Sequence, residues 1–464
     1  MKKPKLSFWQ IWNLSFGFLG VQIGYSLQNS NTSSILQSLG ADLSHLSYFW
    51  LAAPLAGLII QPIIGIFSDG TWTRLGRRIP YIFGGSLIST IALLLMPNCP
   101  TLLAFAPLAM GAVILLFMDL SFNITMQPFR ALVTDMLDDS QKTEGFVVQT
   151  FLINMGAVIG ALLPLIMTWC GVSDQPVEGG VSKHIAYSYY AGGAILLLTV
   201  LVTAFKVKEY PPEEFEKYNE DSIREQQTAK NAPKPGFITL IRNIPKTMLQ
   251  LGVTQFFSWA ALFLMWNYLK PLITSAFVAP DGLSVNVGAA ETWTGVLNAV
   301  YPVPACIAAI FMTKIANCFG NKPVYAFCLL CGAVGYAALT LIHDQYLMMI
   351  PMVFIGIAWA GVLAMPYSIL SRAIDSRSSG AYMGIFNFTI TIPQICMGLV
   401  GGSIVAAIKN GVLDGRMYDN LNGVDKIMVD SQSAAWMIAI AAVFMLLAAI
   451  SVYFVEEKTP ASQE

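Results

Sequence analysis

A carboxylate, an amide and a guanidinium lie along one apolar stretch, MDLSFNITMQPFRALVTD, at residues 118–135. On a helix, Asp119, Asn123 and Arg130 fall within about 40° of one another, with the two charges roughly 16 Å apart along the axis. They make a polar stripe and not a salt bridge. An acid at the centre of a membrane helix costs at least about 2.5–3.5 kcal/mol, so it normally faces a cavity or a partner and has a function.

Asp119 is therefore the first candidate for a functional group. The alternative is that it only links two helices through a buried hydrogen bond. Arg130 lies near the expected end of this apolar run, where its long side chain can reach the membrane interface. A positive residue at that point also serves membrane topology, so Arg130 has a structural explanation as well as a functional one.

A second group of charges follows the apolar run before it, in GIFSDGTWTRLGRRIPY at residues 65–81. Asp69 ends the run, and Arg74, Arg77 and Arg78 cluster directly after it. We expect these four residues to form a conformational latch between neighbouring helices. The simpler alternative is that the arginines are only topology signals.

Amide and aromatic side chains are spread through the apolar runs. Such residues together suit a neutral polyol, because hydroxyl groups need both donors and acceptors and sugar rings need aromatic surfaces. Each amide alone could instead join helices, and each aromatic ring could belong to an interfacial belt. The candidate substrate-binding residues are Gln22, Tyr25, Gln28, Asn123, Gln149, Asn154, Trp266, Asn267, Trp359, Asn387 and Gln394, with Gln255 and Trp259 in the same run as Trp266. Asn387 and Gln394, seven residues apart, are expected within about 20° on one helix face.

The elements that position these residues are membrane spans. Of the 464 residues, 55% are hydrophobic and only 11% are charged, which is outside the range of soluble proteins. A helix needs about 20 apolar residues to cross the hydrocarbon core. Runs of this length occur near 9–37, 46–68, 79–97, 102–130, 145–170, 185–206, 246–275, 291–316, 322–342, 347–371, 380–408 and 433–455.

Basic residues indicate how these spans are oriented. An even number of spans puts both termini on one side, and that side holds all Lys and Arg except Lys183, Lys270, Lys409, Arg416 and Lys426. The positive-inside rule then makes both termini cytoplasmic. No cleavage site follows the first basic residues, so the first span is expected to be retained. A bacterial inner membrane is the expected location of this multi-pass chain.

The chain reads as two halves. Residues 206–236 are highly charged and nearly free of apolar side chains, which indicates a cytoplasmic linker. We expect an N-terminal six-helix bundle at 1–207, a linker at 208–240 and a C-terminal six-helix bundle at 241–464. Arg130-Ala131 and Arg372-Ala373 end matching spans, and Gly76-Arg77-Arg78 matches Gly320-Asn321-Lys322-Pro323. This predicts an all-α protein built from parallel repeats, with a substrate site near the midplane.

Other classes of function find little support. A net charge of −1 gives no sign of nucleic acid binding. The three histidines are far apart, so no metal-ligand spacing exists, and no phosphate-binding G-x-x-x-x-G-K-[ST] motif occurs. The seven scattered cysteines suit helix packing. We expect no enzyme, metal or cofactor, and a monomer whose partners are the lipid bilayer and a small molecule.

Several of these stretches together resemble a known family. The Gly65, Asp69, Gly76, Arg77, Arg78 pattern resembles the cytoplasmic turn of major facilitator transporters, and its ending Ile79-Pro80-Tyr81 is similar to the sucrose transporter and glycoside–cation symporter branch. The stretches Leu19–Gly40, Phe49–Asp69 and Gly384–Gln394 also resemble that branch, in the same order.

The resemblance implies a major facilitator fold and a proton-coupled symporter that imports a glycoside, such as sucrose or maltose. Asp119 then matches the family's proton-coupling carboxylate, and Arg130 its partner arginine. Sodium-using relatives carry acids within the second span, whereas this span has none between His45 and Asp69. Three alternatives stay open: a sodium-coupled carrier, a carrier of another neutral solute, and a carrier-like sugar sensor without net transport.

Overall fold

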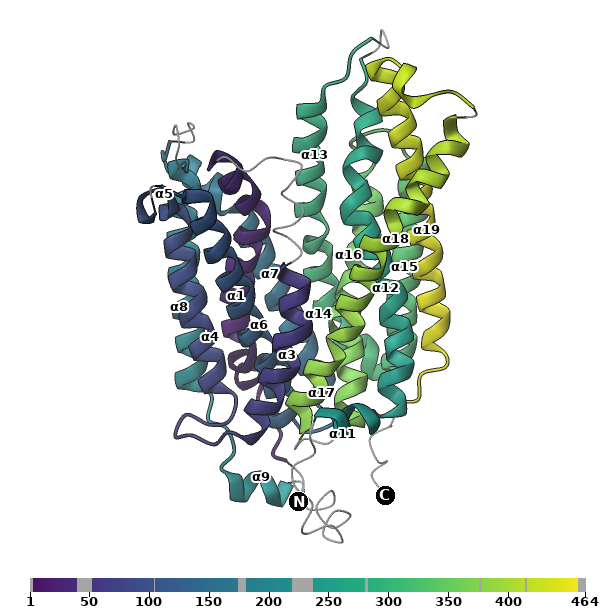
Figure 1. Ribbon diagram of the computed structural model, residues 1–464. Coiled ribbons are helices and arrows are strands. Elements are labelled where there is room, and N and C mark those ends of the chain that lie inside the picture. Colours follow the sequence, from purple (N-terminus) through teal and green to yellow (C-terminus); the bar gives the residue numbers. More distant parts are fainter. Residues whose placement is uncertain are drawn as a thin grey trace. The chain divides into compact units, whose positions relative to one another are not determined.

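The computed structural model describes residues 3–39, 52–103, 105–173, 181–218, 237–279, 283–374, 378–413 and 415–457, which are almost entirely helical (Figure 1). Within these ranges, ten helical segments are long and apolar enough to cross a membrane, and the shorter helix at Ala56–Gly70 is also apolar. The described residues divide into two compact units. Unit 1 comprises Met1–Pro245 and Tyr367–Phe388, and unit 2 comprises Lys246–Pro366 and Thr389–Glu457.

Unit 1 is a bundle of long helices with a few short ones. In it, α1 packs on α7 and α8, while α4 packs on α6 and α8. Rings such as Phe18, Phe122, Phe129 and Phe146 fill its interior. Its helices are α1 (Phe8–Ser38), α3 (Ala52–Gly70), α4 (Ile79–Leu95), α5 (Cys99–Leu102), α6 (Pro107–Met136), α7 (Lys142–Trp169), α8 (Lys183–Lys206), α9 (Pro212–Tyr218), α11 (Phe237–Arg242) and α17 (Ser379–Phe386).

The α3 and α17 helices approach each other closely. A Cβ atom built on Gly65 would lie 2.2 Å from the carbonyl oxygen of Gly380, and one on Gly384 would lie 2.5 Å from that of Gln61. Only residues without a side chain allow backbones to come this near. The glycines therefore fix where α17 rests on α3, which matters for the charges at the end of α3.

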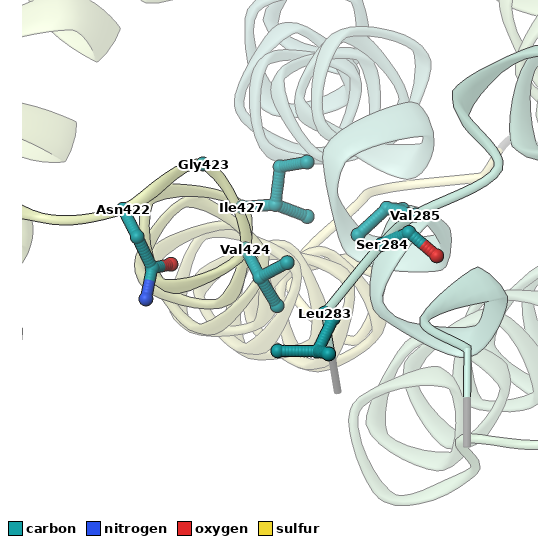
Figure 2. Close-up of a pocket in the computed structure, with 7 residues that line it drawn as sticks. All are labelled: Leu283, Ser284, Val285, Asn422, Gly423, Val424 and Ile427. Carbon is teal, nitrogen blue, oxygen red and sulfur yellow. The ribbon is translucent and has the colours of Figure 1, made fainter. Parts of the chain in front are cut away.

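Unit 2 is organised around α19, which packs on both α12 and α15. Its helices are α12 (Lys246–Thr274), α13 (Val287–Val300), α14 (Pro302–Phe319), α15 (Asn321–Leu341), α16 (Met349–Ala373), α18 (Phe388–Leu413) and α19 (Gly423–Val452). The last turns of α16, from Tyr367 onward, belong to unit 1. A cavity of about 370 Å³ lies beside Gly423, at the start of α19. Figure 2 shows the described residues that line it, none of which is ionisable.

A described helix lies at each of the twelve predicted spans, although two spans are broken. The span predicted at 291–316 divides at Tyr301, because Pro302 has no N–H to continue the helix. The span predicted at 380–408 divides at Asn387, whose N–H bonds to the Gly384 carbonyl, three residues back, as in a 3₁₀ turn. The predicted start of the second span and most of the linker lie outside the described residues, and the domain boundaries stay a prediction.

Candidate functional site

The candidate acid, Asp119, lies on α6 and is almost fully buried, with a relative exposure of 1%. The Gln28 amide of α1 donates to its Oδ1 atom. Within the described ranges, its Oδ2 atom has no hydrogen-bond partner, and no cation lies within 4.0 Å of either oxygen. The carboxyl group is thus held by one neutral amide and keeps one oxygen available to bind a proton.

An amide from a second neighbouring helix, α3, reaches the next turn of α6. Gln61 of α3 donates to Asn123 Oδ1 at 2.7 Å, and Asn123 Nδ2 donates to the Asp119 carbonyl at 2.8 Å. Asn123 therefore has both ends of its amide engaged by protein groups. Each end keeps capacity for one more hydrogen bond, and its substrate-binding role stays a prediction.

Arg130 lies on α6, which continues six residues beyond it to Met136, and its position near the end of the span stays a prediction. Its guanidinium lies 3.9 Å from the ring centre of Tyr367 and 5.8 Å from that of Phe18. Among the described residues, no carboxylate pairs with it. A half-buried cation held only by aromatic rings has all its N–H donors available for a ligand or water.

Tyr367 is a residue that the sequence analysis missed. Its ring contacts Phe146 of α7 at 5.9 Å and Phe386 of α17 at 5.4 Å, measured between ring centres, so two neighbouring rings hold it over Arg130. Tyr367 is 237 positions from Arg130 in the chain. No local sequence pattern reports a contact of that range.

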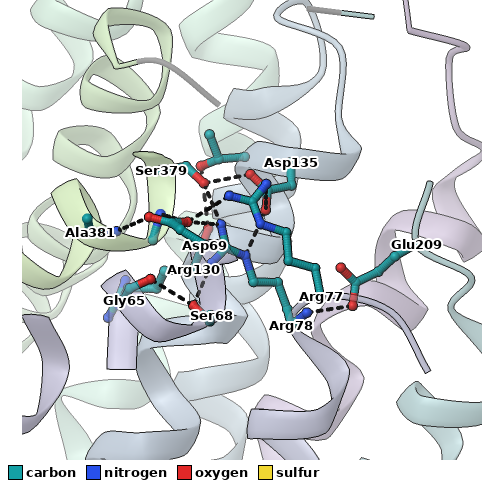
Figure 3. Close-up of polar contacts among 12 residues, drawn as sticks. Gly65, Ser68, Asp69, Arg77, Arg78, Arg130, Asp135, Glu209, Ser379 and Ala381 are labelled. Atoms are coloured by element: carbon teal, nitrogen blue, oxygen red, sulfur yellow. Dashed lines mark hydrogen bonds and ion pairs between the residues drawn. The ribbon is translucent and has the colours of Figure 1, made fainter. Parts of the chain in front are cut away.

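The predicted latch is a buried ionic cluster, which we call the arginine cluster: Asp69, Arg77, Arg78, Asp135 and Ser379 (Figure 3). Arg78 pairs with Asp69 at 2.5 Å and with Asp135 at 2.8 Å, and Arg77 pairs with Asp69 at 2.8 Å. Burial opposes the charge on Arg78, yet Asp135 and Asp69 raise its pKa above the ordinary value. The guanidinium of Arg78 therefore stays charged.

The arginine cluster also holds the start of α17. Asp69 accepts hydrogen bonds from the backbone N–H groups of Gly380 at 3.0 Å and Ala381 at 2.7 Å. Ser379 donates to Asp135 at 2.6 Å and accepts from Arg78 at 2.9 Å. Carboxylates are favourable at a helix N-terminus, where backbone donors are unpaired. The cluster thus joins α3, α6 and α17 at one point.

One predicted latch residue, Arg74, does not join the arginine cluster, and an unpredicted residue, Glu209, contacts it. Arg74 is exposed and forms no ion pair within the described residues, so the structure does not bring it to the other three latch residues. Glu209, from the segment after α8, accepts from the backbone N–H groups of Arg78 at 2.8 Å and Ile79 at 2.9 Å. Burial raises the pKa of the Glu209 carboxyl, while these bonds lower it. In the sequence, Glu209 was one of many charges in a segment that reads as solvated.

The remaining candidates of unit 1 are polar groups in a packed interior. Gln149 donates to the Phe129 carbonyl at 3.2 Å and Asn154 to the Thr150 carbonyl at 2.9 Å, which leaves their amide oxygens without a partner within the described part of the chain. Gln22 and Tyr25 of α1 are half-buried, and the Tyr25 ring lies edge-on to Phe122.

Unit 2 contains an aromatic group that we call the tryptophan cluster: Trp259, Trp266, Tyr301 and Trp359. Ring centres of Trp259 and Trp359 are 5.6 Å apart, those of Trp266 and Trp359 are 6.0 Å apart, and those of Tyr301 and Trp359 are 6.1 Å apart. All three pairs are edge-on, a favourable arrangement for aromatic rings. Trp359 is therefore the centre of the cluster, and Tyr301 is a member that the sequence analysis did not select.

Two buried N–H groups near this cluster lack protein partners among the described residues. They are Trp259 Nε1 and Gln255 Nε2, four residues apart on one face of α12. The other end of the Gln255 amide accepts from Tyr325 at 3.2 Å. A buried unpaired donor costs free energy, so a site with two of them suits a ligand that brings acceptor oxygens.

The other three candidates are less well placed or are separated. Asn267 is exposed on α12 and donates to the Phe263 carbonyl of its own helix at 2.8 Å. Asn387 lies at the break between α17 and α18, and Gln394 lies half-buried within α18. Asn387 keeps helical backbone angles (φ −61°, ψ −20°) and directly precedes α18, and the expectation that it shares a helix face with Gln394 stays a prediction.

No group of three His, Cys, Asp or Glu side chains in the described ranges is placed to hold a metal ion. The candidate site therefore offers the Asp119 carboxyl group and the Arg130 guanidinium, neither of which forms an ion pair within the described residues, together with a set of amides and aromatic rings.

Comparison with known proteins gives a consistent group of relatives. The model of a family described as MFS/sugar transport protein matches residues 35–457. The general alpha-glucoside permease of Schizosaccharomyces pombe is 28% identical over 58% of this chain, which spans about half (49%) of that permease. The sucrose transport protein SUT5 of Oryza sativa subsp. indica is 22% identical over 84% of this chain and 81% of its own.

Solved structures agree on the fold. The proton:xylose symporter XylE has a TM-score of 0.67 at 14% identity, covering 97% of this chain and 96% of its own. The E. coli fucose:proton symporter FucP has a TM-score of 0.68 at 14% identity, covering 97% of this chain and 99% of its own. The all-α membrane fold is therefore the major facilitator fold.

Proposed function

Because the chain belongs to the MFS/sugar transport protein family, whose members are membrane transporters and not enzymes, we propose that it is a proton-coupled symporter that imports a glycoside by alternating access. A disaccharide such as sucrose or maltose is the proposed class of substrate, which fits the alpha-glucoside and sucrose transport named for its relatives. The protein acts as a monomer in a bacterial inner membrane, with both termini in the cytoplasm.

Asp119 is the observation that carries this proposal. A carboxyl group with one oxygen unpaired and no cation nearby can exist in both protonation states, since no fixed positive charge holds it ionised. A proton needs only this one group. Sodium would require several oxygen ligands, and α3 carries no acid between Ala52 and Ser68 to supply them.

Arg130 and Tyr367 act together with Asp119 in the proposed cycle, although not through a direct contact. Arg130 lies too far along α6 for a direct bond to Asp119, so it responds through sugar, water or helix movement. Tyr367, held by α7 and α17, positions its guanidinium. In this proposal, release of α17 from Asp69 would loosen the ring over Arg130, which links the latch to the coupling site.

Sugar recognition is proposed for both units. The buried oxygens of Gln149 and Asn154 would accept hydrogen bonds from sugar hydroxyls, and Gln22 and Tyr25 would add contacts. The tryptophan cluster would pack on the apolar C–H surface of a pyranose ring, with Trp259 Nε1 and Gln255 Nε2 donating to its oxygens. Asn387 and Gln394 are further contacts of this proposal.

Accumulation of labelled sugar by proteoliposomes tests the role of Asp119. With the Asp119→Asn variant, which behaves as permanently protonated, we expect accumulation driven by an inward proton gradient to vanish while downhill sugar exchange continues. The Asp425→Asn variant, which changes an exposed acid at the start of α19, should accumulate sugar normally. A sodium gradient in place of the proton gradient should drive nothing.

Two outcomes would contradict the proposal. If Asp119→Asn still accumulates sugar in response to a proton gradient, coupling lies elsewhere. If the wild-type protein binds sugar but moves none across the membrane, the protein is a sensor.

A further inference from the structure

Unit 1 contains a cavity at the C-terminal end of α8. It has a volume of about 270 Å³ and is bounded by the start of α1, the end of α6 and the segment that follows α8. We call it the lysine pocket. The side chains that matter for its chemistry are Gln10, Asn13, Lys206 and Lys208.

The lysine pocket has an excess of positive charge. Neither Lys206 nor Lys208 has a carboxylate within 4.0 Å in the described part of the chain. The nearest acid in sequence, Glu209, is occupied by the backbone N–H groups of Arg78 and Ile79. Asp139, on the loop after α6, pairs with Lys142 at 2.7 Å. Glu209 and Asp139 are therefore engaged elsewhere, and the two lysines line the pocket without a counter-ion among the described residues.

The amides of the pocket can donate to the same ligand. Gln10 uses its Oε1 atom to accept from the Ser7 N–H at 2.8 Å, which leaves its Nε2 donors available. The Asn13 side chain forms no hydrogen bond among the described residues. Two ammonium groups and two amides with available N–H groups make a site for an oxyanion that also carries hydroxyl groups.

The surroundings of the pocket indicate which anion it would meet. The pocket lies where α1 begins and α8 ends. Aromatic rings next to it are exposed: Phe8 by 49%, Trp9 by 69% and Phe205 by 77%. Exposed aromatic residues at the ends of membrane helices normally lie at the level of the lipid headgroups.

We propose that the lysine pocket binds the phosphodiester headgroup of an anionic phospholipid, with Lys206 and Lys208 at the phosphate and Asn13 and Gln10 at the glycerol hydroxyls. The exposed rings of Phe8, Trp9 and Phe205 then border the acyl chains. This proposal does not depend on the transported solute. Lysines that served only membrane topology would need neither a cavity nor a particular lipid.

Titration of the purified full chain with phosphatidylglycerol tests the site. Lipid retained by the protein would be measured by native mass spectrometry, and the unfolding temperature would be measured in micelles containing either phosphatidylglycerol or phosphatidylcholine. We expect phosphatidylglycerol alone to raise the unfolding temperature of the wild type. The Lys206→Ala/Lys208→Ala variant should bind it about 30-fold more weakly, because each lysine at an anionic surface contributes roughly a factor of five.

Matched variants make the test specific. Lys183→Ala/Lys314→Ala removes the same charge from exposed positions elsewhere and should bind the lipid like the wild type. Lys206→Arg/Lys208→Arg keeps the charge and should bind as well, which also shows that the positions tolerate substitution. Inorganic phosphate at equal concentration should neither stabilise the protein nor displace the lipid.

Three results would overturn the proposal. Equal stabilisation by the two lipids would mean that the pocket does not select charge. Equal weakening in the Lys183/Lys314 variant would mean that only net charge matters. Full stabilisation by inorganic phosphate would make the ligand a soluble anion.

Discussion

A glycine with positive φ precedes α4 in unit 1 and α15 in unit 2, and the residues that follow it are used in two different ways. Gly320 (φ 89°) lies directly before α15, whereas Gly76 (φ 111°) lies three residues before α4, which starts at Ile79. In unit 1, the two arginines that follow Gly76 enter the buried arginine cluster. In unit 2, Asn321 donates to Glu457 at 2.7 Å and Lys322 donates to the Tyr453 carbonyl at 3.1 Å. Both turns thus contain a glycine at a φ that other residues rarely adopt, while its distance from the next helix and the side chains after it differ.

The interiors of the two units also differ: unit 1 contains buried charges, and unit 2 contains an aromatic cluster. The buried ionisable groups discussed above, including Asp119 and the arginine cluster, belong to unit 1. The tryptophan cluster, with its unpaired donors, belongs to unit 2. The comparison suggests a hypothesis: unit 1 supplies protonation and latching, while unit 2 supplies much of the surface for the sugar.

Alanine substitutions at corresponding positions of the two turns should lower the free energy of unfolding by very different amounts. Arg78→Ala leaves Asp69 and Asp135 as buried charges with one arginine between them, so the free energy of unfolding should fall by about 3–5 kcal/mol. Lys322→Ala removes a single hydrogen bond at a half-buried position and should cost about 1 kcal/mol. Thermal unfolding of both variants in detergent measures this difference, and similar losses would show that the turns are equivalent.

Substitution at the centre of the tryptophan cluster should weaken sugar binding without affecting coupling. For Trp359→Leu, we expect about tenfold lower affinity, since an aromatic contact contributes roughly 0.5–1.5 kcal/mol beyond its buried area. Titration calorimetry measures the affinity, and the pH profile of uptake at saturating sugar should keep its midpoint. Trp436→Leu, an exposed tryptophan of α19, is the matched control. A shifted pH profile would mean that Trp359 takes part in proton coupling, contrary to this prediction.

Glu209 tests whether the turn of unit 1 depends on a charge or on an acceptor oxygen. Glu209→Ala leaves two backbone N–H groups unpaired and should lower the free energy of unfolding by about 1–3 kcal/mol. Glu209→Gln keeps an acceptor and should cost less. Because burial raises the pKa of this acid, the folded state binds the proton more tightly, and stability should fall as pH rises through that pKa. Stability curves of the Gln variant should lack this step.

Lys3 gives a separate pH-dependent test of unit 1; it donates to the Thr134 carbonyl at 3.3 Å. Burial and the charge of Lys142 lower its pKa from 10.5 to about 8. Between these two values the unfolded chain binds more protons than the folded chain, so stability should rise as pH increases from about 8 to 10.5. Unfolding temperatures of wild type and Lys3→Met across this range measure the effect. A wild-type slope that persists in Lys3→Met would come from another group.

The sequence predicted the helices well because long apolar runs leave few alternatives in a membrane. It also predicted Asp69, Arg77 and Arg78 as interacting residues, since they are close in the chain. It missed Tyr367, Glu209 and Tyr301, because each acts through a contact with a distant segment. The break at Asn387 was missed for another reason: hydropathy reports whether a run is apolar and not how its backbone is hydrogen-bonded.

The pairing of Gln28 with Asp119 has a consequence for how the protein is made. Spans leave the ribosome in order, so α1 enters the bilayer before α6 does. An acid at the centre of α6 opposes its insertion by about 2.5–3.5 kcal/mol, and apolar neighbours such as Leu115, Leu116 and Phe117 oppose that penalty by only a few tenths of a kcal/mol each. The Gln28 amide of α1, which is already in the bilayer, can donate a hydrogen bond to Asp119 as α6 inserts. Replacing Gln28 by Leu should therefore reduce the yield of inserted protein, and restoring an apolar residue at position 119 should recover it.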